Sequence, residues 1–217
     1  MHNFIQLISV LNIGSDLLAS TCHQSSYTNV IKCYGNYFQY FNLTIGPNVE
    51  FPYYMTFTDR RAKLEKTLGV TGLVNICNVQ KKLIGCLSND ASCINSGDLL
   101  KIGNFEGNDN FLYAGDYSMT SYECTIGYIY MVNNYQCLVN ATYLFNDQFT
   151  NCSSTYIRNI PIEGDCPATN DYIKCFDNIY AVYCGKKAGD FYCNVLTRGL
   201  NILIPECSGK LMTCNPL

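Results

Sequence analysis

The stretch "CFDNIYAVYCGKKAGDFYC", residues 175–193, places three cysteines nine residues apart with aromatic residues between them. A step of nine residues turns a straight α-helix through about 900°, so successive cysteines would lie on opposite sides of it. Three cysteines arranged in this way cannot form one metal-ligand sphere. We therefore expect Cys175, Cys184 and Cys193 each to bridge to a partner outside its own helix.

Apolar residues in and around this stretch recur every three or four positions, as in an amphipathic helix. The pattern runs from Tyr172 to Tyr183, is interrupted at Gly185, and resumes from Ala188 to Leu196. Glycine in a left-handed conformation is a common helix end. The stretch thus predicts a helix, a turn and a second helix.

The same spacing predicts further helices over residues 57–69 and 71–86, and a longer helix between Asp116 and Gln136. These patterns lead us to predict a mainly α protein. We expect a compact, disulfide-cross-linked helical domain of about four to six helices with long loops.

Segments rich in Gly, Pro, Asn and Asp predict loops at residues 45–52, 95–110 and 160–171. The length of 217 residues fits a single cysteine-rich domain, which we assign to residues 21–217. The spacing of Cys77, Cys86 and Cys93 faintly echoes that of the opening stretch. A duplication is therefore left open, and one domain is the prediction.

Cysteine usage gives the strongest inference about the compartment. The chain has 14 cysteines, an even number, and no two are separated by two residues as in structural zinc sites. Its only histidines are His2 and His23. Because disulfides persist outside the cytosol, we predict a secreted, extracellular protein. The cysteine spacing and the scarcity of histidine lead us to expect no metal, and we expect no cofactor. The expected disulfide cysteines are Cys22, Cys33, Cys77, Cys86, Cys93, Cys124, Cys137, Cys152, Cys166, Cys175, Cys184, Cys193, Cys207 and Cys214.

Three acceptor motifs for N-glycosylation agree with secretion. They begin at Asn42, Asn140 and Asn151, and the third has Cys152 as its middle residue, so we expect it to be used less if Cys152 is bridged early. Residues 1–20 resemble a signal peptide, with an apolar run ahead of small residues. No later run is long and apolar enough for a membrane span.

Charge excludes one class of partner. Only 14% of residues are charged, the net charge is −3, and the basic residues are scattered. Binding to a phosphate backbone requires a basic face, so we expect no nucleic-acid partner.

Four segments of the chain are similar to a known protein family: "YFQYFN", "VNICNVQKKLIGCLSNDASC", "YECTIGYIYMVNNYQC" and "DYIKCFDNIYAVYCGKKAGDFYCNV". Over about residues 22–214 the chain resembles the secreted cysteine-rich nematode family catalogued as domain of unknown function nineteen. The resemblance implies a secreted helical domain with disulfides and no established activity. The chain differs from the family in its tyrosine content and its number of cysteines, so neither a catalytic residue nor a pairing scheme is carried over.

No constellation of residues predicts an active site. The chain lacks the Gly-x-Ser-x-Gly elbow of serine hydrolases, and His23 is almost the only candidate general base. We therefore predict a non-catalytic module that binds an extracellular protein or a glycan, with a surface formed by some of its 18 tyrosines. The alternative is a helical carrier of a lipid or another small apolar ligand, which would enclose its ligand in a cavity.

Overall fold

The structure is a computed structural model that describes residues 22–217, and the signal-peptide prediction for residues 1–20 lies outside that range. Ten α-helices occur in the described part, together with short 3₁₀-helices and no β-strand beyond isolated bridges. The mainly α prediction is confirmed, but the predicted number of helices was too low. The 3₁₀-helices are η1 (Gln24–Ser26), η2 (Pro47–Val49), η3 (Ser88–Cys93) and η4 (Pro205–Cys207).

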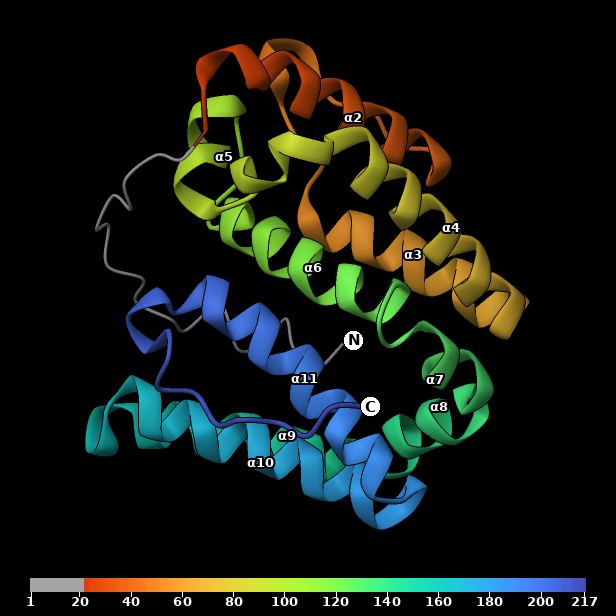
Figure 1. The fold of residues 1–217 in the computed structure, drawn as a ribbon, viewed down its shortest axis with the longest axis vertical. Coiled ribbons are helices and arrows are strands. Elements are labelled where there is room, and N and C mark those ends of the chain that lie inside the picture. Colours follow the sequence, from red (N-terminus) through yellow and green to blue (C-terminus); the bar gives the residue numbers. More distant parts are fainter. Residues whose placement is uncertain (1–21) are drawn as a thin grey trace. The chain divides into compact units, whose positions relative to one another are not determined.

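The described chain divides into two units, residues 22–128 and residues 129–217. We expected one domain, and this stays a prediction because two structural units can still fold as one cooperative domain. Figure 1 shows the helices of each unit, with the first unit running from red to green and the second from green to blue.

In residues 22–128 a central helix, α4, packs against three others, α2, α3 and α6. Aromatic rings from several segments meet in the core: the ring of Phe38 lies 5.6 Å from that of Phe57 and 5.6 Å from that of Tyr113. The helices of this unit are α2 (Tyr27–Tyr40), α3 (Tyr54–Leu68), α4 (Val70–Leu87), α5 (Ser96–Ile102) and α6 (Asp109–Cys124).

In residues 129–217 the helix α10 packs against α8, α9 and α11. The turns on either side of α10 are made by Gly164 (φ 85°) and Gly185 (φ 89°), whose left-handed backbone favours glycine. The predicted helix, turn and helix around Gly185 are therefore confirmed. The helices are α7 (Tyr128–Asn133), which begins at the boundary, α8 (Tyr135–Leu144), α9 (Asn146–Glu163), α10 (Asp165–Cys184) and α11 (Lys186–Leu203).

Three predictions about local structure were wrong. The segment 95–110 contains α5, which begins where the Asn95 side chain accepts a hydrogen bond from the backbone N–H of Asp98. The segment 160–171 is almost entirely helical. Pro167 lies in the first turn of α10, where the missing N–H is tolerated, whereas Pro161 lies inside α9 near its end and removes one hydrogen bond there. The single helix expected from Asp116 to Gln136 is instead broken by a turn at residues 125–127.

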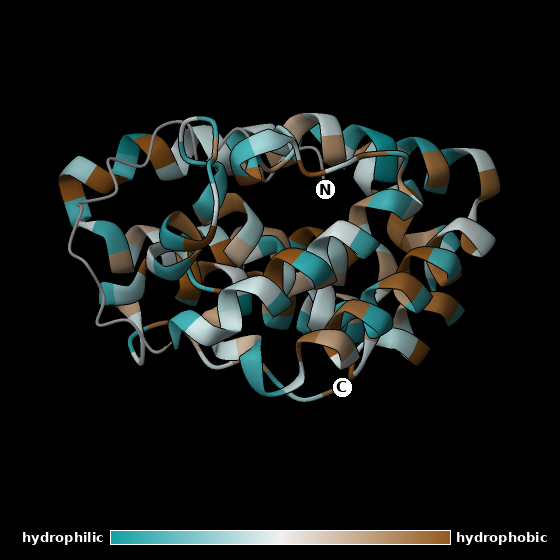
Figure 2. Cartoon of the chain, turned by 90° about the horizontal axis from the view of Figure 1, so that it is seen from above, coloured by the Kyte–Doolittle hydropathy of each residue, from teal (hydrophilic) through white to brown (hydrophobic). Residues whose placement is uncertain are grey.

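Hydrophobic and hydrophilic residues are mixed along most of the helices, as the brown and teal segments of Figure 2 show. Such helices have one apolar side to bury and one polar side for solvent. This explains how a chain with so few charged residues still forms ordinary amphipathic helices.

Seven disulfides join all fourteen cysteines, so the prediction of disulfide cross-links is confirmed. Within the described residues every bond closes inside one of the two units. The first unit holds Cys22–Cys93, Cys33–Cys86 and Cys77–Cys124, and the second holds Cys137–Cys184, Cys152–Cys175, Cys166–Cys207 and Cys193–Cys214.

The three cysteines of the opening stretch bridge outside their own helices, as predicted. Cys175 is bonded to α9, Cys184 to α8, and Cys193 to the C-terminal segment. The similar spacing of cysteines after Cys77 and after Cys175 is not matched by similar disulfide pairing. Cys77 bonds to a later residue, whereas Cys175 bonds to an earlier one.

Candidate functional site

The most strongly perturbed ionisable groups lie in the core of residues 22–128. Arg61 on α3 is 1% exposed, and its guanidinium donates two hydrogen bonds to the carboxylate of Asp116 on α6. The Tyr54 hydroxyl also donates to this carboxylate over 3.1 Å, and the ring of Phe57 lies 4.9 Å from the guanidinium carbon. Burial lowers the pKa of Arg61, but the charge and hydrogen bonds of Asp116, together with the nearby Tyr37 and Tyr54, hold it well above its usual value.

Two other acids of this core hold their protons more tightly than usual. Burial raises the pKa of Glu123 to about 7, against the opposing effect of the Arg61 charge. Burial likewise raises the pKa of Asp109 to about 6, although its carboxylate accepts a hydrogen bond of 2.7 Å from the backbone N–H of Tyr54. Both residues are buried, so we interpret them as parts of the fold.

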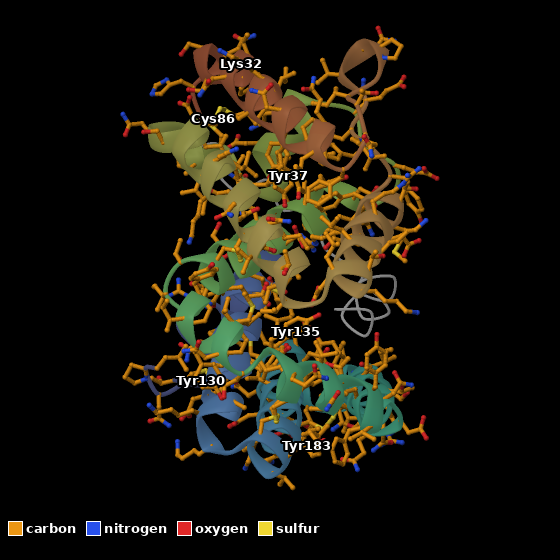
Figure 3. The ribbon with its side chains drawn as sticks, turned by 90° about the vertical axis from the view of Figure 1, so that its right-hand side faces the viewer. Lys32, Tyr37, Cys86, Tyr130, Tyr135 and Tyr183 are labelled. Carbon is orange, nitrogen blue, oxygen red and sulfur yellow. A yellow bond between two sulfur atoms is a disulfide. The ribbon has the colours of Figure 1, made fainter. Side chains whose placement is uncertain are left out.

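The tyrosines are mainly packing residues. Eight of the 18 are buried and only four are exposed, namely Tyr40, Tyr53, Tyr143 and Tyr183. Tyr37, labelled in Figure 3, lies inside the first unit, whereas Tyr183 lies at the end of α10. Since only four of the rings are exposed, a recognition surface formed by tyrosines stays a prediction.

An open pocket of about 400 Å³ lies between α9 and α10 in residues 129–217. We call it the α9–α10 groove. The Cys152–Cys175 disulfide joins the two helices within it and Cys152 is buried, so a covalent bond braces the base of the groove. Its lining residues are Asp147, Gln148, Asn151, Cys152, Cys175, Asn178 and Ile179.

The side chains of the groove suit a ligand with both polar and apolar groups. Gln148, Asn151 and Asn178 are carboxamides, which donate and accept hydrogen bonds. Asp147 is the one charged residue of the described lining, and Ile179 is its aliphatic residue. Such a set can pair with the N–H and C=O groups of a polypeptide while receiving one apolar side chain.

An unusually exposed apolar residue extends the groove along α10. Val182 is 83% exposed, and it follows Asn178 and Ile179 by four and three residues, which places it on the same side of the helix. This end of α10 is held in place by the Cys137–Cys184 disulfide and by the contact of 5.3 Å between the rings of Phe145 and Tyr183. Val182 is therefore presented on a rigid support.

The structure brings only one of the predicted glycosylation acceptors to this groove. Asn151 is exposed and lines it. Asn140 lies on α8, where its Oδ1 accepts a hydrogen bond from Gln136. Asn42 is exposed just after the end of α2 in the other unit. Glycosylation itself stays a prediction at all three residues.

His23, the residue weighed as a general base, is exposed beside the Cys22–Cys93 disulfide. In the part of the chain that the structure describes, no three His, Cys, Asp or Glu residues are grouped so that they could hold a metal ion. Over the same residues, no helix combines the length and the apolar character that crossing a bilayer requires.

Sequence reasoning did not find the groove. The acceptor motif at Asn151 was recognised, but the motif does not show which helix would face it. The one signal that pointed there was Cys152 inside the motif, since its bonded partner had to come from another element.

No family model, no curated protein and no solved structure matches this chain. The resemblance to the nematode family therefore stays a prediction.

Proposed function

We propose that this protein is a secreted, non-catalytic module that binds an extracellular protein through the α9–α10 groove. The observation that carries the proposal is the open groove, braced by Cys152–Cys175 and extended by the exposed Val182. Rigid apolar residues beside hydrogen-bonding groups are favourable for binding, because little conformational freedom is lost on association. The expected partner presents an apolar side chain on a polypeptide segment.

The disulfides support the secreted part of the proposal. All fourteen cysteines are paired, which is typical of proteins that fold in an oxidising compartment. The nematode family that the chain resembles is also secreted. Both points favour an extracellular partner.

The lining of the groove favours a protein over the other ligand classes. Sugars commonly stack on aromatic rings, and no aromatic residue is among the described lining residues. A lipid carrier needs an enclosed apolar cavity, whereas this pocket is open to solvent. A bound lipid chain would remain exposed to water there.

The position of the perturbed acids supports a non-catalytic role. Enzymes concentrate shifted pKa values in the cleft where the chemistry occurs. Here Asp109 and Glu123, the acids whose pKa is raised most clearly, lie in the core of the other unit. Their perturbation is a consequence of burial.

The test is a selection of peptides from a displayed random library on the full secreted protein. The affinity of the selected peptides is then measured for the Val182→Asp variant. Val182 is exposed, so the substitution leaves the fold intact, and an interface contact at this position is worth about a tenfold change in Kd. The expected result is that peptides with an apolar residue bind the unmodified protein and lose at least this factor with Val182→Asp.

Ile162→Asp is the matched control, because Ile162 is 74% exposed and lies near the far end of α9 from the groove. The affinity of the Ile162→Asp variant for the selected peptides should equal that of the unmodified protein. A selection that yields no binders, or binders equally indifferent to both substitutions, would overturn the proposed function.

A further inference from the structure

The acceptor motif Asn151-Cys152-Ser153 occupies one turn of α9 and has a different role for each residue. Asn151 lines the groove with an exposed side chain, and Cys152 is bonded to Cys175. Ser153 is 3% exposed and its hydroxyl donates to the carbonyl of Phe149 over 3.1 Å. The folded helix therefore hides the hydroxyl that a glycosyltransferase must recognise.

Modification of Asn151 thus has to precede the folding of α9. Transfer forms a bond between Nδ2 of Asn151 and the anomeric carbon of the sugar, and it breaks the bond from that carbon to the pyrophosphate of a lipid-linked donor. The proton lost from Nδ2 passes to a base of the transferase. All of this requires the motif to be extended and accessible, which the unfolded chain allows and α9 does not.

The disulfide next to Asn151 closes early for a physical reason. Cys152 and Cys175 are 23 residues apart, close to the 21 of Cys193–Cys214, whereas Cys137–Cys184 and Cys166–Cys207 span 47 and 41 residues. Short loops lose less conformational entropy on closure. Closure also fixes the middle residue of the motif against α10, so it withdraws Asn151 from the transferase.

We propose that Asn151 is a conditional acceptor: closure of Cys152–Cys175 prevents its glycosylation and so keeps the α9–α10 groove open. A chain modified at Asn151 before closure would carry a bulky sugar on the wall of the groove. The competition between disulfide closure and sugar transfer then divides the product into open and blocked forms. The consequence for binding, though not the competition itself, rests on the proposed function.

The other two acceptors are internal references. The motifs at Asn42 and Asn140 contain no cysteine, so closure of a disulfide does not pass through them. Their occupancy should be governed by ordinary access during translocation.

The experiment measures glycan occupancy at each acceptor by mass spectrometry of peptides from protein secreted by eukaryotic cells. We expect occupancy at Asn151 to be the lowest of the three in the unmodified chain. In Cys175→Ser the competing closure is lost, and occupancy at Asn151 should rise about twofold or more while the references stay the same. Occupancy is fixed before folding, so cell-retained chains are measured as well in case this variant is secreted poorly.

Two further variants keep the test sharp. Ser153→Thr leaves the disulfide intact and provides a better acceptor, so occupancy at Asn151 should rise. Cys137→Ser breaks a different disulfide of the same unit and should leave Asn151 unchanged. Full occupancy in the unmodified chain, no response to Cys175→Ser, or an equal response to Cys137→Ser would overturn the inference.

The consequence for the groove is read separately. The glycosylated fraction of Ser153→Thr should lose the peptides selected on the unmodified protein, whereas the unglycosylated fraction of the same variant should keep them. If occupancy follows the prediction but peptide binding is unaffected by the sugar, the competition stands and the use of the groove fails. If occupancy does not follow it while Val182→Asp still weakens binding, the inference fails and the proposed function stands.

Discussion

The guanidinium of Arg61 and the carboxylate of Asp116 form a buried two-point ion pair, in which Nη1 lies 2.9 Å from Oδ2 and Nη2 contacts Oδ1. Both residues lie in the core of residues 22–128, on α3 and α6. The pair therefore links two helices that have no disulfide between them.

Removing one member of this pair should be far more harmful than removing both. Asp116→Ala leaves a buried guanidinium without its counter-charge, which typically costs about 3 to 5 kcal/mol of unfolding free energy. The double variant Arg61→Met with Asp116→Leu buries no charge and should lose much less. Denaturant unfolding of the oxidised protein measures both, with Arg60→Ala, an exposed neighbour, as the control. Equal losses in the single and double variants would contradict this account.

Burial of Glu123 should make stability fall as the pH rises. Its pKa is raised from 4.5 to about 7 in the folded protein, so between these values the folded state binds more protons than the unfolded state. The free energy of unfolding should then decrease from about pH 4.5 to about pH 7, by on the order of 3 kcal/mol for a shift of this size.

Glu123→Gln should flatten this slope and stabilise the protein above pH 7 relative to the unmodified chain. Asp109, with its pKa raised to about 6, contributes in the same direction, so part of the slope remains. Glu50→Gln, at an exposed position, serves as the control. A slope that is the same with and without Glu123 would show that this carboxyl is not the cause.

Two glycines of α4 should respond oppositely to alanine. A Cβ on Gly72 would lie 2.7 Å from the carbonyl oxygen of Leu64 and 2.9 Å from the Cα of Glu65, so Gly72→Ala should destabilise by about 1 to 3 kcal/mol. A Cβ on Gly85 meets nothing within 4 Å, so Gly85→Ala should stabilise by about 0.5 to 1 kcal/mol through helix propensity. Thermal unfolding of the two variants under one buffer distinguishes them, and a gain from Gly72→Ala would refute the close approach of α3 and α4.

Cleavage at methionine should reveal the grouping of the disulfides directly. The sequence has five methionines, Met1, Met55, Met119, Met131 and Met212. Cyanogen bromide cuts after each of them, and cleavage after Met131 lies between Cys124 and Cys137. Without reduction the fragments should stay together as two separate disulfide-linked products, one from each side of Met131.

The masses of these products provide the check, since each must fall apart on reduction into the fragments that its own disulfides had joined. A single cross-linked product that contains residues from both sides of Met131 would show that the pairing is wrong. If fragment 120–131 were released before reduction, without a second fragment attached to it, Cys124 would not be bonded to Cys77.

The sequence predicted the fold where short-range patterns determine the structure. The spacing around Gly185 was enough to predict two helices and the turn between them, because a glycine there permits the left-handed backbone. Composition gave a wrong prediction at residues 160–171, where Pro161 and Pro167 suggested a loop. Pro167 lies in the first turn of α10, which tolerates proline, and Pro161 is contained in α9 close to its end.

The candidate site was less accessible to sequence reasoning. The groove joins α9 to α10 through residues about 25 positions apart, and pairing among fourteen cysteines cannot be deduced from spacing alone. The placement of the tyrosines could not be predicted for a related reason. Which rings become core and which remain exposed depends on the packing of several helices, as for Tyr37 and Tyr183.

The burial of tyrosine has an optical consequence. The chain contains no tryptophan, so its near-ultraviolet absorption and its emission come from tyrosine. Burial holds the pKa values of Tyr34, Tyr54 and Tyr113 far above those of free phenols, so these rings ionise only when the core opens. The delayed appearance of phenolate absorbance in alkaline solution is therefore a label-free signal that a core has opened, and Tyr172 gives the same signal for residues 129–217.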